Sequence, residues 1–215
     1  MEPTARADLS RTWALVPIRG LESAKTRLGS HLDPEERLEL VTELLRRTLE
    51  ATRDARRIAG TIVVTMDGDA AELAGRHGAI GLVERAPGLN AAIEAARSVA
   101  IARGATAVLV VPADLPAASS DAIDALVRSA EAAAADGPGI VALVGDRHGS
   151  GTNALLLAPP SVIAPAFGID SRVAHARAAA EAGTRFVELE SPLAFDVDTS
   201  ADLLAAEAAL GPLRG

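Results

Sequence analysis

The sequence predicts an α/β protein in which a mostly parallel sheet is flanked by helices. Short apolar runs alternate with helical segments of about a dozen residues, the pattern of a layered α/β fold. The run Ala107-Val-Leu-Val-Val111 is continuously apolar, as in a central strand buried on both faces. Polar residues follow directly after several of these runs, where the ligands of such sheets bind.

The individual elements follow from apolar spacing and capping signals. Asp33-Pro-Glu-Glu36 predicts a helix start, with aspartate as N-cap and proline in the first turn, and Ser119 or Ser120 caps a later helix. We expect strands at 13–17, 61–65, 80–83, 107–111, 140–144, 154–157 and 185–189. We expect the further helices at 69–76, 90–103, 119–135, 171–182 and 199–210. A single domain over 1–215 is the simplest organisation, with residues 1–10 as a flexible N-terminal tail.

Composition excludes several classes of protein. The 215 residues are 49% hydrophobic, enough for a sizeable core. A net charge of -8 and an aromatic fraction of 2% disfavour nucleic-acid binding. No apolar run reaches the roughly 20 residues that span a bilayer, and the polar N-terminus is unlike a signal peptide. With no cysteine in the chain, we expect a cytoplasmic protein without membrane or nucleic-acid partners.

Three cations follow the first predicted strand, within the segments Pro17-Ile-Arg19-Gly20 and Ala24-Lys25-Thr26-Arg27-Leu28. A loop of this kind can wrap a triphosphate, with lysine as a point charge and arginine as a bidentate fork. The glycine pattern of a P-loop is missing. The alternative interpretation is an ordinary solvated basic loop.

Carboxylates stand at two further strand ends. Asp114, bracketed by Pro112 and Pro116, ends the central strand and could hold a metal that bridges phosphates. Asp196 and Asp198 lie on the same side of an extended segment, where they repel each other unless a cation lies between them. The alternatives are an Asx turn at Asp114 and a helix N-cap at Asp198.

Two glycine-containing turns are candidate anion sites. His148-Gly-Ser-Gly-Thr152-Asn153 would let the backbone approach an anion, although a plain hairpin turn fits as well. In Phe167-Gly168-Ile-Asp-Ser171, Ser171 is a natural N-cap, and a helix N-terminus binds anions readily. His148 and His175 lack metal-ligand spacing and are expected to be ordinary surface or core histidines. Asn90 could simply cap its helix.

Taken in order along the chain, these motifs resemble the 2-phospho-L-lactate or phosphoenolpyruvate guanylyltransferases. The resemblance rests on six segments: Val16-Pro-Ile-Arg-Gly with Ala24-Lys-Thr-Arg-Leu28, Gly88-Leu-Asn90, Pro112-Ala-Asp-Leu-Pro116, Gly149-Ser-Gly-Thr-Asn-Ala154, Phe167-Gly-Ile-Asp-Ser171 with His175, and Asp196-Val-Asp-Thr199-Ser-Ala-Asp202. It implies a Rossmann-like nucleotidyltransferase sandwich with a mixed sheet. It also implies GTP as donor, Mg²⁺ as cofactor, and a place in the biosynthesis of the deazaflavin coenzyme F-420.

The resemblance also implies roles for individual residues. Asp114, Asp196 and Asp198 would bind metal, and Thr152, Gly168 and Ser171 would bind the phosphoacid together with Arg19. Nucleotide binding would fall to Pro17, Lys25, Arg27 and Asn90, and catalysis to Arg19, Lys25, Arg27 and Asp114. Arg19 stands where the family often has lysine, so a planar guanidinium replaces a compact ammonium group there. The implied partners are GTP, phosphoenolpyruvate or 2-phospho-L-lactate, and a downstream transferase of the pathway.

The expected reaction needs no covalent intermediate. A phosphate oxygen of the acid attacks the α-phosphorus of GTP, and pyrophosphate leaves. The sequence leaves the acid open between phosphoenolpyruvate, 2-phospholactate and 3-phosphoglycerate, and the alanine- and arginine-rich composition favours phosphoenolpyruvate by association. Three alternatives stay open: a metal-dependent glycosyltransferase that uses Asp196-Val-Asp198 as its sugar-nucleotide clamp, another nucleotidyltransferase of this fold, and a non-catalytic nucleotide-binding subunit.

Overall fold

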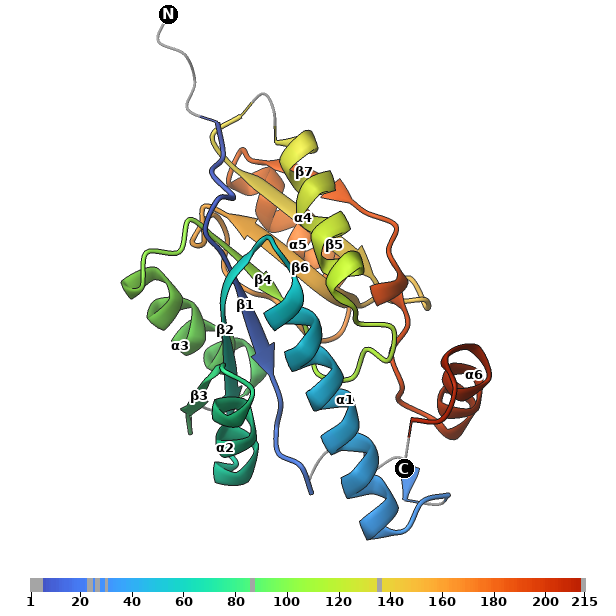
Figure 1. The fold of residues 1–215 in the computed structure, drawn as a ribbon. Helices are drawn as coiled ribbons and strands as arrows, with labels where there is room; N and C mark the ends of the chain where they lie inside the picture. The colour runs from blue at the N-terminus through green and yellow to red at the C-terminus, as the bar shows by residue number, and fades with distance from the viewer. Residues whose placement is uncertain are drawn as a thin grey trace, which may run out of the picture.

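The computed structural model describes residues 6–22, 25, 28–29, 31–85, 88–134 and 137–213, which build one mixed sheet with helices on both faces (Figure 1). The sheet has seven strands within these residues, in the order β3-β2-β1-β4-β6-β5-β7. The strands are β1 (Thr12–Pro17), β2 (Ile58–Thr65), β3 (Ile80–Val83), β4 (Ala107–Val110), β5 (Ile140–Gly145), β6 (Thr152–Ala158) and β7 (Arg185–Glu188).

Strand direction brings several loops to one edge of this sheet. Strands β1 to β4 run parallel, whereas β6 is antiparallel to both β4 and β5, and β7 is parallel to β5. The carboxyl ends of β1, β4, β5 and β7 therefore meet at the same edge. The turn from β5 to β6 lies there as well, which is where a sheet of this type binds ligands.

The helices form two layers and a peripheral cover. Helices α1 (Pro34–Asp54), α2 (Gly68–Arg76) and α4 (Ser120–Ala133) pack on one face of the sheet, and α3 (Leu89–Ala102) and α5 (Ser171–Glu181) pack on the other. Helix α6 (Ser200–Leu210) lies against the N-terminal half of α1, where Leu203 packs with Leu40 and Leu44. A short 3₁₀ turn, Pro192–Ala194, precedes it.

The predicted fold class is confirmed, as are the order and type of the elements. Strand β4 is buried along its whole length, as its apolar run indicated. Helix α1 begins at the predicted N-cap, where the Asp33 carboxylate accepts from the backbone of Glu35 and Glu36. Strand β2 begins at Ile58, earlier than expected, and its first three residues, Ile58 to Gly60, are less buried than the rest of the strand.

The predicted helix cap at Ser171 is wrong, and the alternative role of Asp198 as a helix cap is excluded. The N-cap of α5 is Asp170, in the left-handed region at φ 53°, and Ser171 is the first helical residue with its hydroxyl turned to Thr152. The N-cap of α6 is Thr199, so Asp198 does not cap that helix. In both cases a motif with two possible capping residues uses the neighbour, which leaves Ser171 and Asp198 for other contacts.

The predicted flexible tail does not extend over residues 6–10. Ala7 and Leu9 are buried in the core beneath α4, and the Ala7 N–H donates to the carbonyl oxygen of Gly137 at 3.0 Å. Residues 1–5 lie outside the described part of the chain. Within the described part, no helix combines the length and apolarity needed to cross a membrane.

Gly81 lets α2 lie directly on β3. A Cβ at this position would stand 2.3 Å from the carbonyl oxygen of Ala71, a backbone atom that cannot rotate away. Gly81→Ala should therefore destabilise the protein by about 1–3 kcal/mol, the usual cost of overpacking. Urea denaturation measures this change.

Gly75→Ala is the matched control, on α2, the helix that Gly81 contacts. Its added Cβ meets no atom within 4 Å, and replacing a helical glycine by alanine stabilises by roughly 0.5–1 kcal/mol. Equal effects of the two substitutions would contradict the close approach of α2 to β3.

Candidate active site

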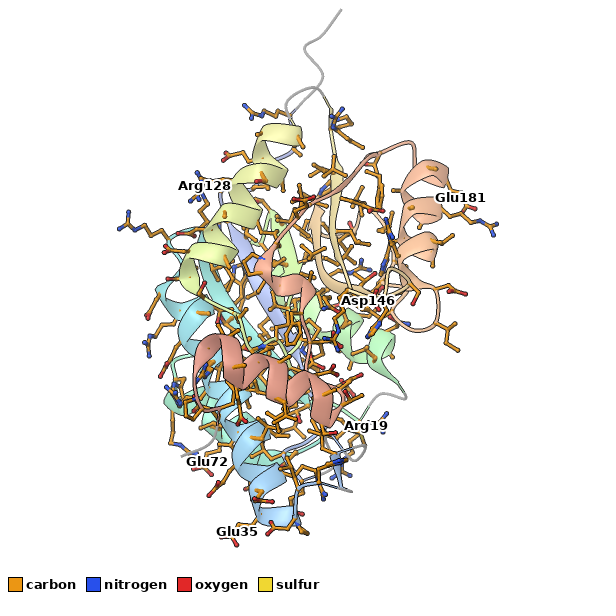
Figure 2. All side chains as sticks on the ribbon, turned by 90° about the vertical axis from the view of Figure 1, so that its right-hand side faces the viewer. Arg19, Glu35, Glu72, Arg128, Asp146 and Glu181 are labelled. Carbon is orange, nitrogen blue, oxygen red and sulfur yellow. The ribbon has the colours of Figure 1, made fainter. Side chains whose placement is uncertain are left out.

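A cleft of about 810 Å³ opens at the edge where the strand ends meet. Its walls come from the loop after β1, the loop after β4, the β5–β6 turn, the turn before α5 and the segment before α6. Figure 2 shows Arg19 and Asp146 on the side of the molecule that carries α6, while Glu35, Arg128 and Glu181 lie at the periphery. The chain thus gathers at one place most of the motifs that the sequence singled out.

The ammonium group of Lys25 lies between two carboxylates of this cleft. Lys25 Nζ donates to Asp114 Oδ2 and to Asp198 Oδ1, both at 2.8 Å. The lysine side chain is only 9% exposed, whereas Asp114 and Asp198 are 32% and 45% exposed. Burial alone would lower the pKa of Lys25, but the two carboxylates outweigh it, and the pKa is raised. Lys25 is therefore charged near neutral pH.

Asp196 extends this group of charges. Its pKa is raised by burial and by the nearby carboxylates of Asp114 and Asp198. The side-chain amide of Asn153 interacts with this carboxylate and partly opposes the rise in its pKa. The Val197 N–H donates to the Asp114 carbonyl oxygen at 3.2 Å, which ties the segment of Asp196 and Asp198 to the loop after β4.

Two of the three predicted metal ligands, Asp114 and Asp198, meet at Lys25, which fills the space between them, and Asp196 lies near both. No three His, Asp or Glu side chains are grouped around a common metal position in the described ranges. The donors nevertheless suit Mg²⁺, which takes one or two protein carboxylates and completes its shell with water and substrate phosphates. The half-buried carboxylate of Asp196 beside those of Asp114 and Asp198 is the observation that most favours a cation at this place, because a cation would relieve their mutual repulsion.

A second pocket adjoins the cleft beyond the ends of β1, β2 and β3. It has a volume of about 480 Å³ and shares Pro17 and Arg19 with the cleft. The exposed side chains of Met66 and Leu89 give it apolar walls, and Glu84 is the acidic residue in its lining. An apolar pocket with few polar groups has the character of a site for a flat ring system.

Asn90 does not cap α3, whose N-cap is Gly88. The Asn90 amide instead exchanges two hydrogen bonds with the backbone of Phe167: Nδ2 donates to its carbonyl oxygen at 3.0 Å, and Oδ1 accepts from its N–H at 2.8 Å. Asn90 therefore positions the turn that carries Gly168, which lines the cleft. Direct nucleotide binding by Asn90 stays a prediction.

Thr152 and Ser171 lie behind the wall of the cleft in a buried network around His175. The His175 Nε2 accepts from the Ala166 N–H at 2.9 Å, so the ring carries its proton on Nδ1, which faces Thr152 Oγ1 at 3.1 Å. Ser171 Oγ donates to the same threonine oxygen at 3.1 Å. Thr152 accepts both bonds and keeps its own proton for another acceptor.

The structure thus brings only some of the predicted site residues together in the cleft. Arg19, Lys25, Asp114, Asp198, Gly168 and Pro17 line the cleft, and Thr152 and Ser171 support it from behind. Arg27 lies outside the described residues. Sequence reasoning gave no role to Glu84, Asp146 or Arg147. Their only signal was position, since Glu84 and Asp146 follow directly after strands and Arg147 is the next residue after Asp146.

The fold is that of nucleotidyltransferases. A nucleotidyl transferase from Methanothermobacter superposes with a TM-score of 0.64 at 19% identity, covering 93% of this chain and 97% of the other. 4-Diphosphocytidyl-2C-methyl-D-erythritol synthase from Anaerococcus prevotii superposes with a TM-score of 0.61 at 11% identity, covering 96% and 98%.

Sequence comparison places the chain more narrowly. Residues 12–207 match the family described as "Guanylyl transferase CofC like", and the chain belongs to this family. The phosphoenolpyruvate guanylyltransferase of Sphaerobacter thermophilus is 45% identical over 203 residues, with 93% of this chain and 95% of the relative covered. The enzyme of the same name from Rubrobacter xylanophilus is 42% identical, with 93% and 95% covered. The family resemblance inferred from the six motifs is confirmed.

The buried network predicts a pH dependence of stability. Burial lowers the pKa of His175 to about 4, whereas the unfolded chain protonates near the ordinary value of about 6.5. The stabilisation is fully present above about pH 6.5 and is lost as the pH falls toward 4, because only the unfolded state takes up the proton in that window. The loss should approach roughly 3 kcal/mol.

Urea denaturation of the wild type and His175→Gln between pH 4 and 8 measures this effect. Acidic groups common to both proteins cancel in the difference. We expect the stability difference to shrink as the pH falls below 6.5. Parallel curves would show that His175 is not held neutral by the fold.

Proposed function

We propose that this chain transfers GMP from GTP to phosphoenolpyruvate with release of pyrophosphate, as a Mg²⁺-dependent step in coenzyme F-420 biosynthesis. Membership of the guanylyltransferase family and the names of its relatives support the reaction class. The observation that carries the proposal is the arrangement of Lys25, Asp114 and Asp198, which joins a charged lysine to carboxylates at the carboxyl edge of the sheet.

The two adjoining hollows suit the two parts of the donor. The base and ribose would occupy the apolar pocket beside Met66 and Leu89, and the triphosphate would run past Arg19 into the cleft. Arg19 borders both, so it would contact the phosphates where they leave the nucleoside. Lys25 would exchange one of its carboxylate contacts for a phosphate oxygen.

The acid would lie on the opposite wall, between Gly168 and the β5–β6 turn. Gly168 at φ 136° presents open backbone there, since a Cβ would meet no atom within 4 Å. The remaining proton of Thr152 would reach a carboxylate or phosphate oxygen of the acid from behind this wall, and Ser171 would hold Thr152 in place. Both residues would then act on the acid, as the family resemblance implies.

The transfer itself needs orientation and charge compensation. A phosphate oxygen of the acid forms a bond to the α-phosphorus of GTP, and the bond from that phosphorus to the β-phosphate bridging oxygen breaks, releasing pyrophosphate. The acid phosphate is already ionised near neutral pH, because its second pKa is about 6, so no general base is required. Lys25 and Arg19 stabilise the charge that develops on the transferred and leaving groups.

The residues that would hold Mg²⁺ are Asp114, Asp198 and Asp196. When bound, the ion would neutralise phosphate charge and orient the reacting groups. Asp196 is half-buried beside the other two carboxylates, and Asp114 and Asp198 are already held within reach of one cation, the ammonium of Lys25.

Pyrophosphate release tests the proposal. The protein is incubated with GTP, Mg²⁺ and, in separate reactions, phosphoenolpyruvate, 2-phospho-L-lactate or 3-phosphoglycerate. The downstream transferase is added where the product inhibits. We expect pyrophosphate with phosphoenolpyruvate. A nucleoside diphosphate in its place would indicate a glycosyltransferase, and no turnover with any acid would indicate a binding protein.

Asp114→Asn should abolish most of the activity and leave the fold intact. The loss of one strong electrostatic contact in an active site typically costs about 10²–10³ in rate. Asp121→Asn, an exposed residue in the first turn of α4, is the matched control and should keep the wild-type rate. Near-normal turnover of Asp114→Asn at saturating Mg²⁺ would show that Asp114 takes no part in the reaction.

Glu84 should select the base. A carboxylate in the nucleoside pocket can accept from both N1–H and the exocyclic amino group of guanine, whereas adenine has no proton at N1. Glu84→Gln should raise the KM for GTP about tenfold or more, since hydrogen bonds to charged groups contribute roughly 1.5–3 kcal/mol. The KM for ATP should change little.

Glu72→Gln on the outer side of α2 is the control for this change, because its carboxylate pairs only with Arg76 among the described residues. Kinetics with GTP and ATP measure both variants. An unchanged GTP preference in Glu84→Gln would place the base elsewhere.

A further inference from the structure

A buried carboxylate outside the cleft fixes the backbone of Asp198. Asp202, in the first turn of α6, is 4% exposed. Its Oδ2 accepts from the Asp198 N–H at 3.0 Å and from the Thr199 N–H at 2.7 Å. The Thr199 hydroxyl accepts in return from the Asp202 N–H at 3.3 Å. This reciprocal cap determines how the chain enters α6 and hence where the Asp198 side chain points.

The side chain of Asp198, in contrast to its backbone, lies in the cleft. Its Oδ1 lies 2.8 Å from Lys25 Nζ, and the preceding residue, Val197, donates to the backbone of Asp114. The Asp198 side chain is therefore set by two anchors, one at Asp114 on the sheet side and one at Asp202 on the helix side. A shift of the second anchor would move the carboxylate relative to Lys25.

Arg147, which is distant from Asp202 in the sequence, holds the second anchor in place. This residue belongs to the β5–β6 turn, and its Nη2 forms an ion pair with Asp202 Oδ1. Its guanidinium also lies 4.7 Å from the ring centroid of Phe195, next to Asp196 in the chain. The side chain of Asp202 is 5% exposed, so the arginine compensates a charge that would otherwise be buried alone.

The turn that carries Arg147 also forms the proposed acid wall of the cleft. Asp146, Ser150 and Gly151 of this turn line the cleft. Arg172 of α5 fixes the turn from the other side, with Nη1 donating to the Gly149 carbonyl oxygen at 3.0 Å. The ion pair of Arg147 with Asp202 thus connects the acid wall to the carboxylate segment, which is the stretch of chain that carries Asp196 and Asp198.

A helix start alone does not require this arrangement. Helix α4 begins with a serine whose side chain accepts one hydrogen bond from the Ala122 N–H. At α6, by contrast, a buried carboxylate takes two backbone N–H groups and an arginine from a distant turn. These interactions all converge on Asp202, which in turn holds the backbone of Asp198, the residue whose side chain contacts Lys25.

We propose that Arg147 and Asp202 are positioning residues for the transfer reaction, with Arg147 acting through Asp202 on the orientation of Asp198. The inference rests on the proposed function of the cleft. It means that the acid wall and the carboxylate segment hold their relative position through one ion pair, and that breaking the pair slows the reaction without unfolding the protein.

The test compares Arg147→Gln, Arg147→Lys and Asp202→Asn with the wild type. Measured are kcat, the KM values for GTP and phosphoenolpyruvate, the half-saturating Mg²⁺ concentration and Tm. We expect Arg147→Gln to lower kcat about 10–100-fold, the usual effect of removing a residue that orients a ligand residue, with a smaller change in either KM. The half-saturating Mg²⁺ concentration should rise, and Arg147→Lys should recover part of the loss.

Arg57→Gln is the matched control. Arg57 pairs with Glu131 at 2.7 Å, its side chain is 36% exposed against 32% for Arg147, and it lies away from the cleft. Its kcat should equal that of the wild type. The double variant Arg147→Gln/Asp202→Asn should be no slower than Asp202→Asn alone, because the two residues act through one contact.

Two results would overturn the inference. One is a wild-type kcat in Arg147→Gln with only a lower Tm, which would make the pair purely structural. The other is multiplication of the two rate losses in the double variant, which would separate Arg147 from Asp202. The wild-type rate tests the proposed function by itself, whereas the ratios of the variants to the wild type test only this inference.

Discussion

The contact of Lys25 with Asp114 and Asp198 is the interaction on which the rest of the site depends. Three segments that are distant in sequence meet at one ammonium group, and each carries a charge that would be unfavourable without the others. The parallel strands make this meeting possible, because β1 and β4 end side by side at the same edge of the sheet. This charge balance suits the polyanionic substrates that we propose for the cleft.

The fold could be predicted from the sequence because its signals are local. The buried run of β4, the capped start of α1 at Asp33 and the alternation of strands with helices each report on their own segment. Errors occurred where two neighbouring residues offered the same local chemistry. Asp170 caps α5 where Ser171 was expected, and Thr199 caps α6 where Asp198 was possible, because tertiary contacts decide between adjacent polar side chains.

The site could be predicted only in part. Charged residues after strand ends identified Arg19, Lys25, Asp114 and Asp198, since strand polarity alone sends them to one edge. Which carboxylate pairs with which cation depends on long-range packing, so no pattern indicated that Arg147 reaches Asp202. The burial of His175 with Thr152 and Ser171 was equally hidden, because polar side chains at the start of a strand or on a helix are as compatible with the surface as with the core.

In the proposed reaction, the cleft transfers a guanylyl group from GTP to the phosphate of a second polyanion. The most direct measurement is a single-turnover reaction with GTP labelled either at the α- or at the γ-phosphorus, in the presence of phosphoenolpyruvate and Mg²⁺. We predict that the α-label appears in a new ester of the acid and the γ-label in pyrophosphate, for the wild type but not for Asp114→Asn. Transfer of the γ-label to the acid, or release of GDP, would contradict the account.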